Sequence, residues 1–331
     1  MHNGRKRLVT SILGVALAGS VGMIPTSSAQ AKPSVTDVQN RVDRLYHAAE
    51  RASERYNAIR VQLKQMHGDV QALRSDQARQ QRKTEKARRL IADTIVRQYE
   101  GQSLSAVGQA VVSSDPSAFV SQLTTMSAFN SMQSSQYSSY VTQAKALSIR
   151  KEATNAQLQK VATLTKQAAQ DKASIDKKLA AAKNLLSTLK ANQQARMTEV
   201  SRGSTVRTPT VNVPVSGRAA AAVQFALAQV GKAYVYGAAG PDAYDCSGLT
   251  MRAWGAAGVA LAHSSTAQWG EGTHVSESAL QPGDLVFYYS PSQHVGMYIG
   301  NGMIVNAENP SAGIRVVPLN SMPDVGAVRP G

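Results

Sequence analysis

Along the first third of the chain, hydrophobic or small residues recur in steps that alternate between three and four. This series occupies Val35, Val38, Val42, Leu45, Ala49, Ala52, Tyr56, Ile59, Leu63, Met66, Val70 and Leu73. A seam held for more than five heptads is typical of a coiled coil. A second periodic stretch runs from Leu158 to Leu189. The pattern therefore predicts two long, slender helices.

The periodicity breaks off between these two stretches. Residues 99–123 contain two glycines and Pro116, and Asp115 or Ser114 can cap a helix that begins near this proline. Residues 32–200 are thus expected to form a long antiparallel α-helical coiled-coil hairpin with a short irregular tip. A helix of about 65 residues is roughly 100 Å long. Since such a rod is too thin to enclose an active site, we expect it to position, regulate or bind.

The helical pattern stops after Val200. Residues 201–217 contain two prolines and several threonines and serines without a continuous apolar face, which indicates a flexible linker. The remaining residues, 218–331, have the usual size of one globular domain. An alanine-rich segment at 218–230 predicts the first helix of this domain.

Strand signals dominate the second half of this domain. The segment 283–290 is rich in aromatic and β-branched residues. Residues 294–308 have the pattern of a β-hairpin that turns at Gly300-Asn301-Gly302.

The chain contains a single cysteine, Cys246. A glycine-rich loop precedes it, and the residues after it have a helical pattern that ends at Gly255 or Gly258. Cys246 is therefore expected at a helix N-terminus, where free backbone N–H groups lower the pKa of a thiol. One cysteine cannot form an internal disulfide. It is a reactive thiol, an intermolecular link or a buried inert residue.

A candidate base for this thiol lies on the predicted hairpin. His294 opens the first strand, and Asn306 is a polar residue among apolar neighbours on the return strand. If all three turn residues form the loop, Asn306 lies opposite Gly296 and on the face of His294. A two-residue turn would place it on the other face. A nucleophile, a base and a residue that orients the base follow the logic of a catalytic triad.

The N-terminus indicates the compartment. Three basic residues at 5–7 precede an apolar run from Leu8 to Ile24, and Ala29-Gln30-Ala31 offers a small-x-small cleavage site. This layout predicts a secretory signal peptide at 1–31. A retained membrane anchor is the alternative, but the run is shorter than the roughly 20 residues that span a bilayer. We therefore expect an exported protein of the cell envelope, outside the cytoplasmic membrane.

Positive charge is concentrated in the middle of the chain. Of 36 Lys and Arg and 21 Asp and Glu residues, 28 and 14 lie in 32–214, which gives this segment a net charge of +14. A basic rod on an exported protein favours anionic envelope polymers or lipid headgroups as partners. Nucleic acid is not an expected partner.

Four sequence blocks in the compact domain occur in the same order as in a known family. "YDCSGLTMRAW", "LAHSSTAQW", "LQPGDLVFY" and "HVGMYIGNGMIVNA" closely resemble the NlpC/p60 family of cell-wall endopeptidases, which are papain-like cysteine peptidases. The resemblance covers about 215–331. It implies an α+β fold in which an antiparallel sheet packs against helices. The preceding coiled coil also resembles that of mycobacterial-type envelope hydrolases, in architecture only.

The resemblance also implies roles for individual residues. Cys246 would be the nucleophile, His294 the general base and Asn306 the residue that orients the histidine, with Glu308 as a distant alternative to Asn306. No cofactor or metal is implied. The residues expected to line the cleft and hold the stem peptide are Tyr234, Asp245, Ser247, His263, Ser265 and Gln268.

The expected function is therefore a peptidoglycan endopeptidase. By resemblance, the bond cleaved joins the γ-carboxyl of D-glutamate to the diamino acid of the stem peptide, and the rod would answer to a division-associated membrane complex. A metal hydrolase is disfavoured because the sequence has no His-Glu-x-x-His motif. A non-catalytic wall-binding or scaffold protein is the alternative of a different class. For the rod, autoinhibition and simple tethering both remain open.

Overall fold

A computed structural model describes residues 34–100, 116–189, 193–194 and 217–331. The predicted signal peptide, the irregular tip between the long helices and most of the predicted linker lie outside these residues. Val35–Gly331 forms one compact unit. Among the described residues, no helix has the length and apolar character needed to cross a membrane.

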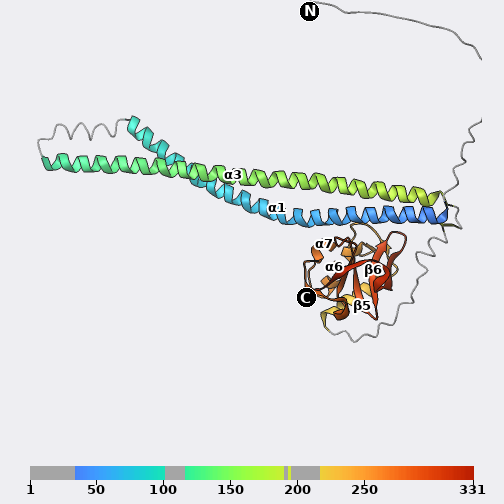
Figure 1. Cartoon of the computed structure of the whole chain (residues 1–331). Coiled ribbons are helices and arrows are strands. Elements are labelled where there is room, and N and C mark those ends of the chain that lie inside the picture. Colours follow the sequence, from blue (N-terminus) through green and yellow to red (C-terminus); the bar gives the residue numbers. More distant parts are fainter. Residues whose placement is uncertain (1–33, 101–115, 190–192, 195–216) are drawn as a thin grey trace, which may run out of the picture. The chain divides into compact units, whose positions relative to one another are not determined.

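Two long helices precede the compact domain. They are α1, Val35–Tyr99, and α3, Pro116–Ser187, and Figure 1 shows them running side by side. Ion pairs between the two helices show their relative direction. Arg55 contacts Asp171 at 2.6 Å and Asp76 contacts Arg150 at 2.6 Å, so residue numbers fall on α3 as they rise on α1. The helices are antiparallel, as the heptad pattern predicts, and α3 begins at the proline expected in its first turn.

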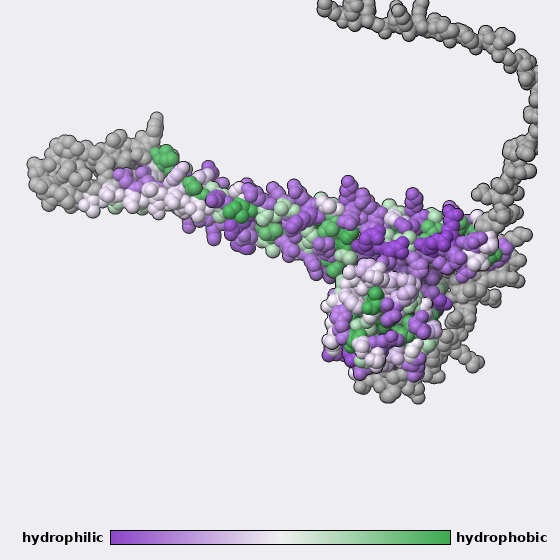
Figure 2. Space-filling model, viewed as in Figure 1, coloured by the Kyte–Doolittle hydropathy of each residue, from purple (hydrophilic) through white to green (hydrophobic). Residues whose placement is uncertain are grey.

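The seam between these helices is best packed in the first half of α1. The buried apolar residues of α1 are Val38, Val42, Tyr46, Ala49, Ala52, Ile59, Met66 and Val70. Farther along, Leu90 and Ile95 are 45% and 59% exposed, and Tyr137 of α3 is 65% exposed. Figure 2 accordingly shows hydrophilic side chains covering most of the visible rod, interrupted by hydrophobic ones. The coil is therefore held mainly by its first half.

The compact domain contains three α-helices and eight strands. The helices are α5 (Arg218–Leu227), α6 (Cys246–Ala256) and α7 (Ser265–Gln268), with 3-10 turns η1 (Glu277–Ala279) and η2 (Leu319–Ser321). The strands are β1 (Ala233–Tyr234), β2 (Ala243–Tyr244), β3 (Thr273–Val275), β4 (Leu285–Tyr288), β5 (His294–Gly300), β6 (Met303–Asn309), β7 (Gly313–Pro318) and β8 (Asp324–Arg329).

Six of these strands form one antiparallel sheet in the order β3-β8-β4-β5-β6-β7. Alternate residues of a strand point to opposite faces. Leu285 and Phe287 of β4 therefore join a core with α5 and α6, while Val286 and Tyr288 join a smaller cluster on the other face. This arrangement confirms the α+β class expected from the sequence.

Of the two registers that the sequence leaves open for the hairpin of β5 and β6, the structure has the one that places Asn306 on the face of His294. Met297 pairs with Val305 and Tyr298 with Ile304, and the ladder shifts by one residue beside the turn. Strand β4 is shorter than the predicted segment 283–290. The backbone at Gly283 (φ 102°) and Tyr289 (φ 56°) departs from extended geometry on either side.

Gly248 in the first turn of α6 is a packing constraint that can be tested. A Cβ at this position would overlap the carbonyl oxygen of Ala238 and lie 2.9 Å from His263 Nε2. Gly248→Ala should therefore destabilise the domain by roughly 1–3 kcal/mol. Guanidinium unfolding followed by tryptophan fluorescence measures this change, since both tryptophans, Trp254 and Trp269, lie in this domain.

Gly255 in the same helix provides the matched control. A Cβ there has no atom within 4 Å. Gly255→Ala should be neutral or stabilise by about 0.5–1 kcal/mol, because alanine loses less backbone entropy in a helix. Equal effects of the two substitutions would contradict the packing assignment.

Candidate active site

The thiol of Cys246 is placed by the start of α6. Asp245 caps this helix, and its Oδ1 accepts a 2.7 Å hydrogen bond from the N–H of Gly248. Its Oδ2 accepts another, of 2.9 Å, from the N–H of Gly237. Cys246 is the first helical residue and is buried. The sequence prediction of a cysteine at a helix N-terminus is confirmed in this respect.

The hairpin of β5 and β6 brings the imidazole of His294 and the side-chain amide of Asn306 together. His294 Nε2 lies 3.0 Å from Asn306 Oδ1, and both residues are fully buried. An amide oxygen only accepts hydrogen bonds, so Nε2 carries a proton. The other nitrogen, Nδ1, is the one left for chemistry. Glu308, the alternative to Asn306, instead forms an ion pair with Arg315.

Helix α1 inserts a carboxylate against this imidazole. Glu50 Oε1 lies 2.5 Å from His294 Nδ1. Glu50 is only 5% exposed although it belongs to the coiled coil. The nitrogen that a base would offer to the thiol is thus occupied by a side chain of the rod.

A second carboxylate of α1 covers the thiol itself. Cys246 Sγ lies 3.4 Å from Glu54 Oε1, which also accepts a 2.8 Å hydrogen bond from the hydroxyl of Ser247. Glu54 Oε2 lies 2.6 Å from the backbone nitrogen of Ser265 and 2.8 Å from its hydroxyl oxygen. Glu54 is therefore held by three residues of the compact domain.

These contacts set the ionisation of His294 and Glu50. Burial alone would lower the pKa of His294, but the charge and hydrogen bond of Glu50 outweigh it and raise the pKa. Burial likewise opposes ionisation of Glu50, yet His294 leaves the pKa of Glu50 below its ordinary value. The two residues form a buried ion pair.

The environment of Cys246 disfavours ionisation of its thiol. Burial, followed by the charges of Glu54, Glu50 and Asp245, raises the pKa of Cys246 well above its ordinary value. Since the thiolate is the nucleophilic form, a protonated thiol is unreactive. The imidazolium of His294 is paired with a carboxylate of α1, and the thiol stays neutral.

The carboxyl group of Glu54 is held in a buried polar environment. The hydroxyl of Ser265 lies 2.8 Å from Glu54 Oε2 and 2.6 Å from the carbonyl oxygen of Ser292. Burial, followed by the charge of Asp245, raises the pKa of Glu54, although the hydrogen bonds from Ser247 and Ser265 lower it in part.

Further contacts fix α1 beside the cysteine. Asn57 Nδ2 donates a 2.9 Å hydrogen bond to Asp245 Oδ2. The hydroxyl of Tyr236 donates to the carbonyl oxygen of Tyr46 at 2.9 Å, and the hydroxyl of Tyr46 lies 3.1 Å from that of Ser311. Polar contacts therefore extend over more than two turns of α1.

The residues predicted to hold the substrate lie around this cluster. Asp245 pairs with His263 Nε2 at 2.7 Å, while Ser247 and Ser265 bind the carboxyl of Glu54. The hydroxyl of Tyr234 is buried and has no hydrogen-bond partner in the part of the chain that the structure describes.

Gln268 has a different position from the other predicted cleft residues. It is fully buried, and its amide binds Thr250 and the carbonyl oxygens of Ser247 and Ala262. It joins α6 to α7 and has no free face toward a cleft.

Sequence reasoning missed the contribution of Glu50, Glu54 and Asn57. Their spacing of four and three residues places them on one helix face, outside the heptad seam, where charged residues are usually solvated. One weak signal existed, because like charges four residues apart destabilise a free helix. The pair Glu50 and Glu54 therefore hints at an external partner.

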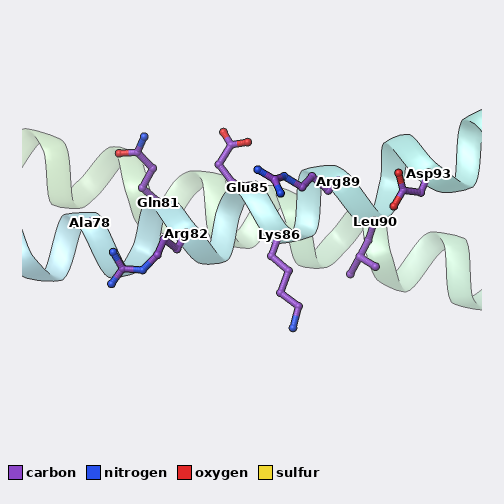
Figure 3. Close-up of a pocket in the computed structure, with 8 residues that line it drawn as sticks. All are labelled: Ala78, Gln81, Arg82, Glu85, Lys86, Arg89, Leu90 and Asp93. Carbon is purple, nitrogen blue, oxygen red and sulfur yellow. The ribbon is translucent and has the colours of Figure 1, made fainter.

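A surface hollow elsewhere on α1 is a poor candidate for chemistry. It is lined by residues between Ala78 and Asp93. Figure 3 shows Gln81 and Glu85 pointing to one side of the helix and Lys86 and Leu90 to the other. Its polar groups do not converge on a common point, in contrast to those around Cys246.

Comparison with known proteins shows what the domain that carries this buried Cys-His-Asn cluster is similar to. Residues 231–323 match the NlpC/P60 family model. This match confirms that the C-terminal domain resembles the NlpC/P60 family, as the sequence indicates.

Relatives of known name share this domain. A probable endopeptidase of Mycobacterium tuberculosis is 48% identical over 105 residues, which cover 32% of this chain and 27% of that protein. A probable endopeptidase of Corynebacterium glutamicum is 41% identical over 116 residues, covering 35% of this chain and 56% of that protein. The match thus spans less than two thirds of either relative.

Among solved structures, the P60 domain of an antigen from M. avium subspecies paratuberculosis is similar. It is 27% identical, with coverage of 34% of this chain and 93% of that one, and a TM-score of 0.32.

Proposed function

We propose that this protein is a cysteine endopeptidase of peptidoglycan that is kept latent by its own coiled coil. The observation that carries the proposal is the joint placement of Cys246, His294 and Asn306 under two carboxyl groups of α1. The relatives named as probable endopeptidases support a peptidase.

The chemistry follows from the cluster once α1 withdraws. Once Glu50 has withdrawn, His294 Nδ1 gives its proton to solvent, and the neutral nitrogen then takes the proton of Cys246 while Asn306 keeps the imidazole oriented through Nε2. The thiolate attacks the peptide carbonyl to form a thioester, and the imidazolium protonates the leaving amine. Water then hydrolyses the thioester with His294 as base. The hydroxyl of Tyr234, which has no hydrogen-bond partner among the described residues, is suited to donate to the oxyanion.

The proposed substrate is the stem peptide at the bond between γ-D-glutamate and the diamino acid. Glu54 supports a site for a carboxyl group, since Ser247 and Ser265 already hold one there. Asp245 and His263 lie beside the same position. A substrate carboxylate would replace Glu54 at these donors, so substrate and α1 compete for one place.

The proposed location is the cell envelope, outside the cytoplasmic membrane. The layout of residues 1–31 as a signal peptide supports export. We further propose that a division-associated membrane complex acts on the coiled coil and releases α1. The excess of basic residues along 32–214 supports an additional attraction to anionic envelope polymers.

Latency predicts that removing the two carboxylates activates the enzyme. The full chain with Glu50→Ala and Glu54→Ala should hydrolyse a small soluble muropeptide about tenfold or more faster than the wild type, because observed activity scales with the competent fraction. Product masses give both the rate and the bond cleaved.

A matched control separates latency from a general effect on the rod. Glu85 is an exposed glutamate of α1 that pairs with Arg88. Glu85→Ala should leave the rate unchanged. Equal rates for wild type and the double variant would discard autoinhibition and leave the coil as a tether, since a soluble substrate does not depend on wall binding.

Covalent catalysis is tested in the activated background. Cys246→Ala added to the double variant should abolish muropeptide hydrolysis, because no other cysteine is present to replace the nucleophile. Hydrolysis that continues at the same rate would show that the mechanism is wrong. If the double variant itself has no activity on any stem peptide, the scaffold alternative replaces the enzyme.

A further inference from the structure

The latent site contains three different metal-binding side chains. Glu50, Cys246 and His294 each offer one ligand atom, and these atoms all lie within 4.8 Å of one another. All three residues are buried. A carboxylate oxygen, a sulfur and an imidazole nitrogen form a donor set that suits zinc.

The second shell of this cluster also fits a metal. A histidine that binds a metal through one nitrogen usually donates its other N–H to an oxygen. His294 does so through Nε2 to Asn306 Oδ1 at 3.0 Å. Its Nδ1 therefore has a lone pair available when the proton shared with Glu50 leaves.

A polar side chain near the cluster lacks a partner. The hydroxyl of Tyr234 makes no hydrogen bond among the described residues, although it is buried. Glu50 and Cys246 both act electrostatically on this hydroxyl. A tetrahedral ion with three protein ligands has a fourth position, and a water there can donate a hydrogen bond to the hydroxyl oxygen of Tyr234.

We infer that the closed state binds one Zn²⁺ between α1 and the catalytic pair, with Glu50, Cys246 and His294 as ligands. Binding releases two protons, one from the thiol and one from between Nδ1 and Glu50, and involves no redox change. Since Glu50 belongs to the rod and the other two ligands to the peptidase domain, the ion joins them. Zinc would thus strengthen latency rather than assist hydrolysis.

This inference rests on the proposed latency, but its test measures metal and not hydrolysis. Equilibrium dialysis of the full wild-type chain against Zn²⁺ should give one bound ion per chain. Co²⁺ in place of Zn²⁺ should produce a sulfur-to-cobalt charge-transfer band. This band requires a thiolate ligand, and Cys246 is the only cysteine that can supply it. Zinc should also raise the midpoint of thermal unfolding.

Two variants locate the site. Glu50→Gln keeps the size of the side chain but removes a ligand, and it should weaken zinc binding by about tenfold or more. Glu54→Gln removes a carboxyl group from the same face of α1 without removing a ligand, so its effect should be much smaller. Glu85→Gln serves as the exposed control and should change nothing.

Absence of a stoichiometric zinc ion and of the cobalt band in the wild type would overturn the inference. So would zinc affinity unchanged by Glu50→Gln, because the metal would then lie elsewhere or on the catalytic pair alone. If the variant without Glu50 and Glu54 is activated but the wild-type chain binds no zinc, the proposal of latency stands and only the proposal of a metal site is wrong.

Discussion

The buried ion pair between Glu50 and His294 is the interaction on which the rest of this structure depends. An imidazolium in a thiol peptidase normally balances the thiolate. Here Glu50 takes that role at 2.5 Å, and the thiol of Cys246 remains protonated beside Glu54. The groups that we propose for catalysis therefore lie close together but carry charges that oppose it.

The rod can hold this pair because two faces of α1 make different contacts. Val42 and its neighbours on the seam pack against α3, while Glu50, Glu54 and Asn57 contact the peptidase domain. Release of α1 breaks this ion pair together with the hydrogen bonds of Glu54 and Asn57, so activation requires a partner or substrate that compensates for them.

Much of this architecture could be predicted from the sequence. The heptad seam indicates α1, and glycines and a cysteine indicate the start of α6. The turn at 300–302 allows two registers, and the structure has the one that places Asn306 beside His294. These features are local or periodic. The contact of Glu50 with His294 joins residues 244 positions apart, and nothing in the heptad pattern distinguishes Glu50 from a solvated glutamate. The same holds for Gln268, whose buried amide looks like a cleft residue in sequence.

The central claim is that carboxylates of α1 keep Cys246 protonated and covered, and alkylation of the thiol tests it most directly. Cys246 is the only cysteine, so the mass gained from iodoacetamide by the full chain reports this site alone. The account predicts slow alkylation of the wild type and of Glu85→Ala, and a rate roughly tenfold or more higher in the chain with Glu50→Ala and Glu54→Ala. Equal rates in all three proteins would contradict it.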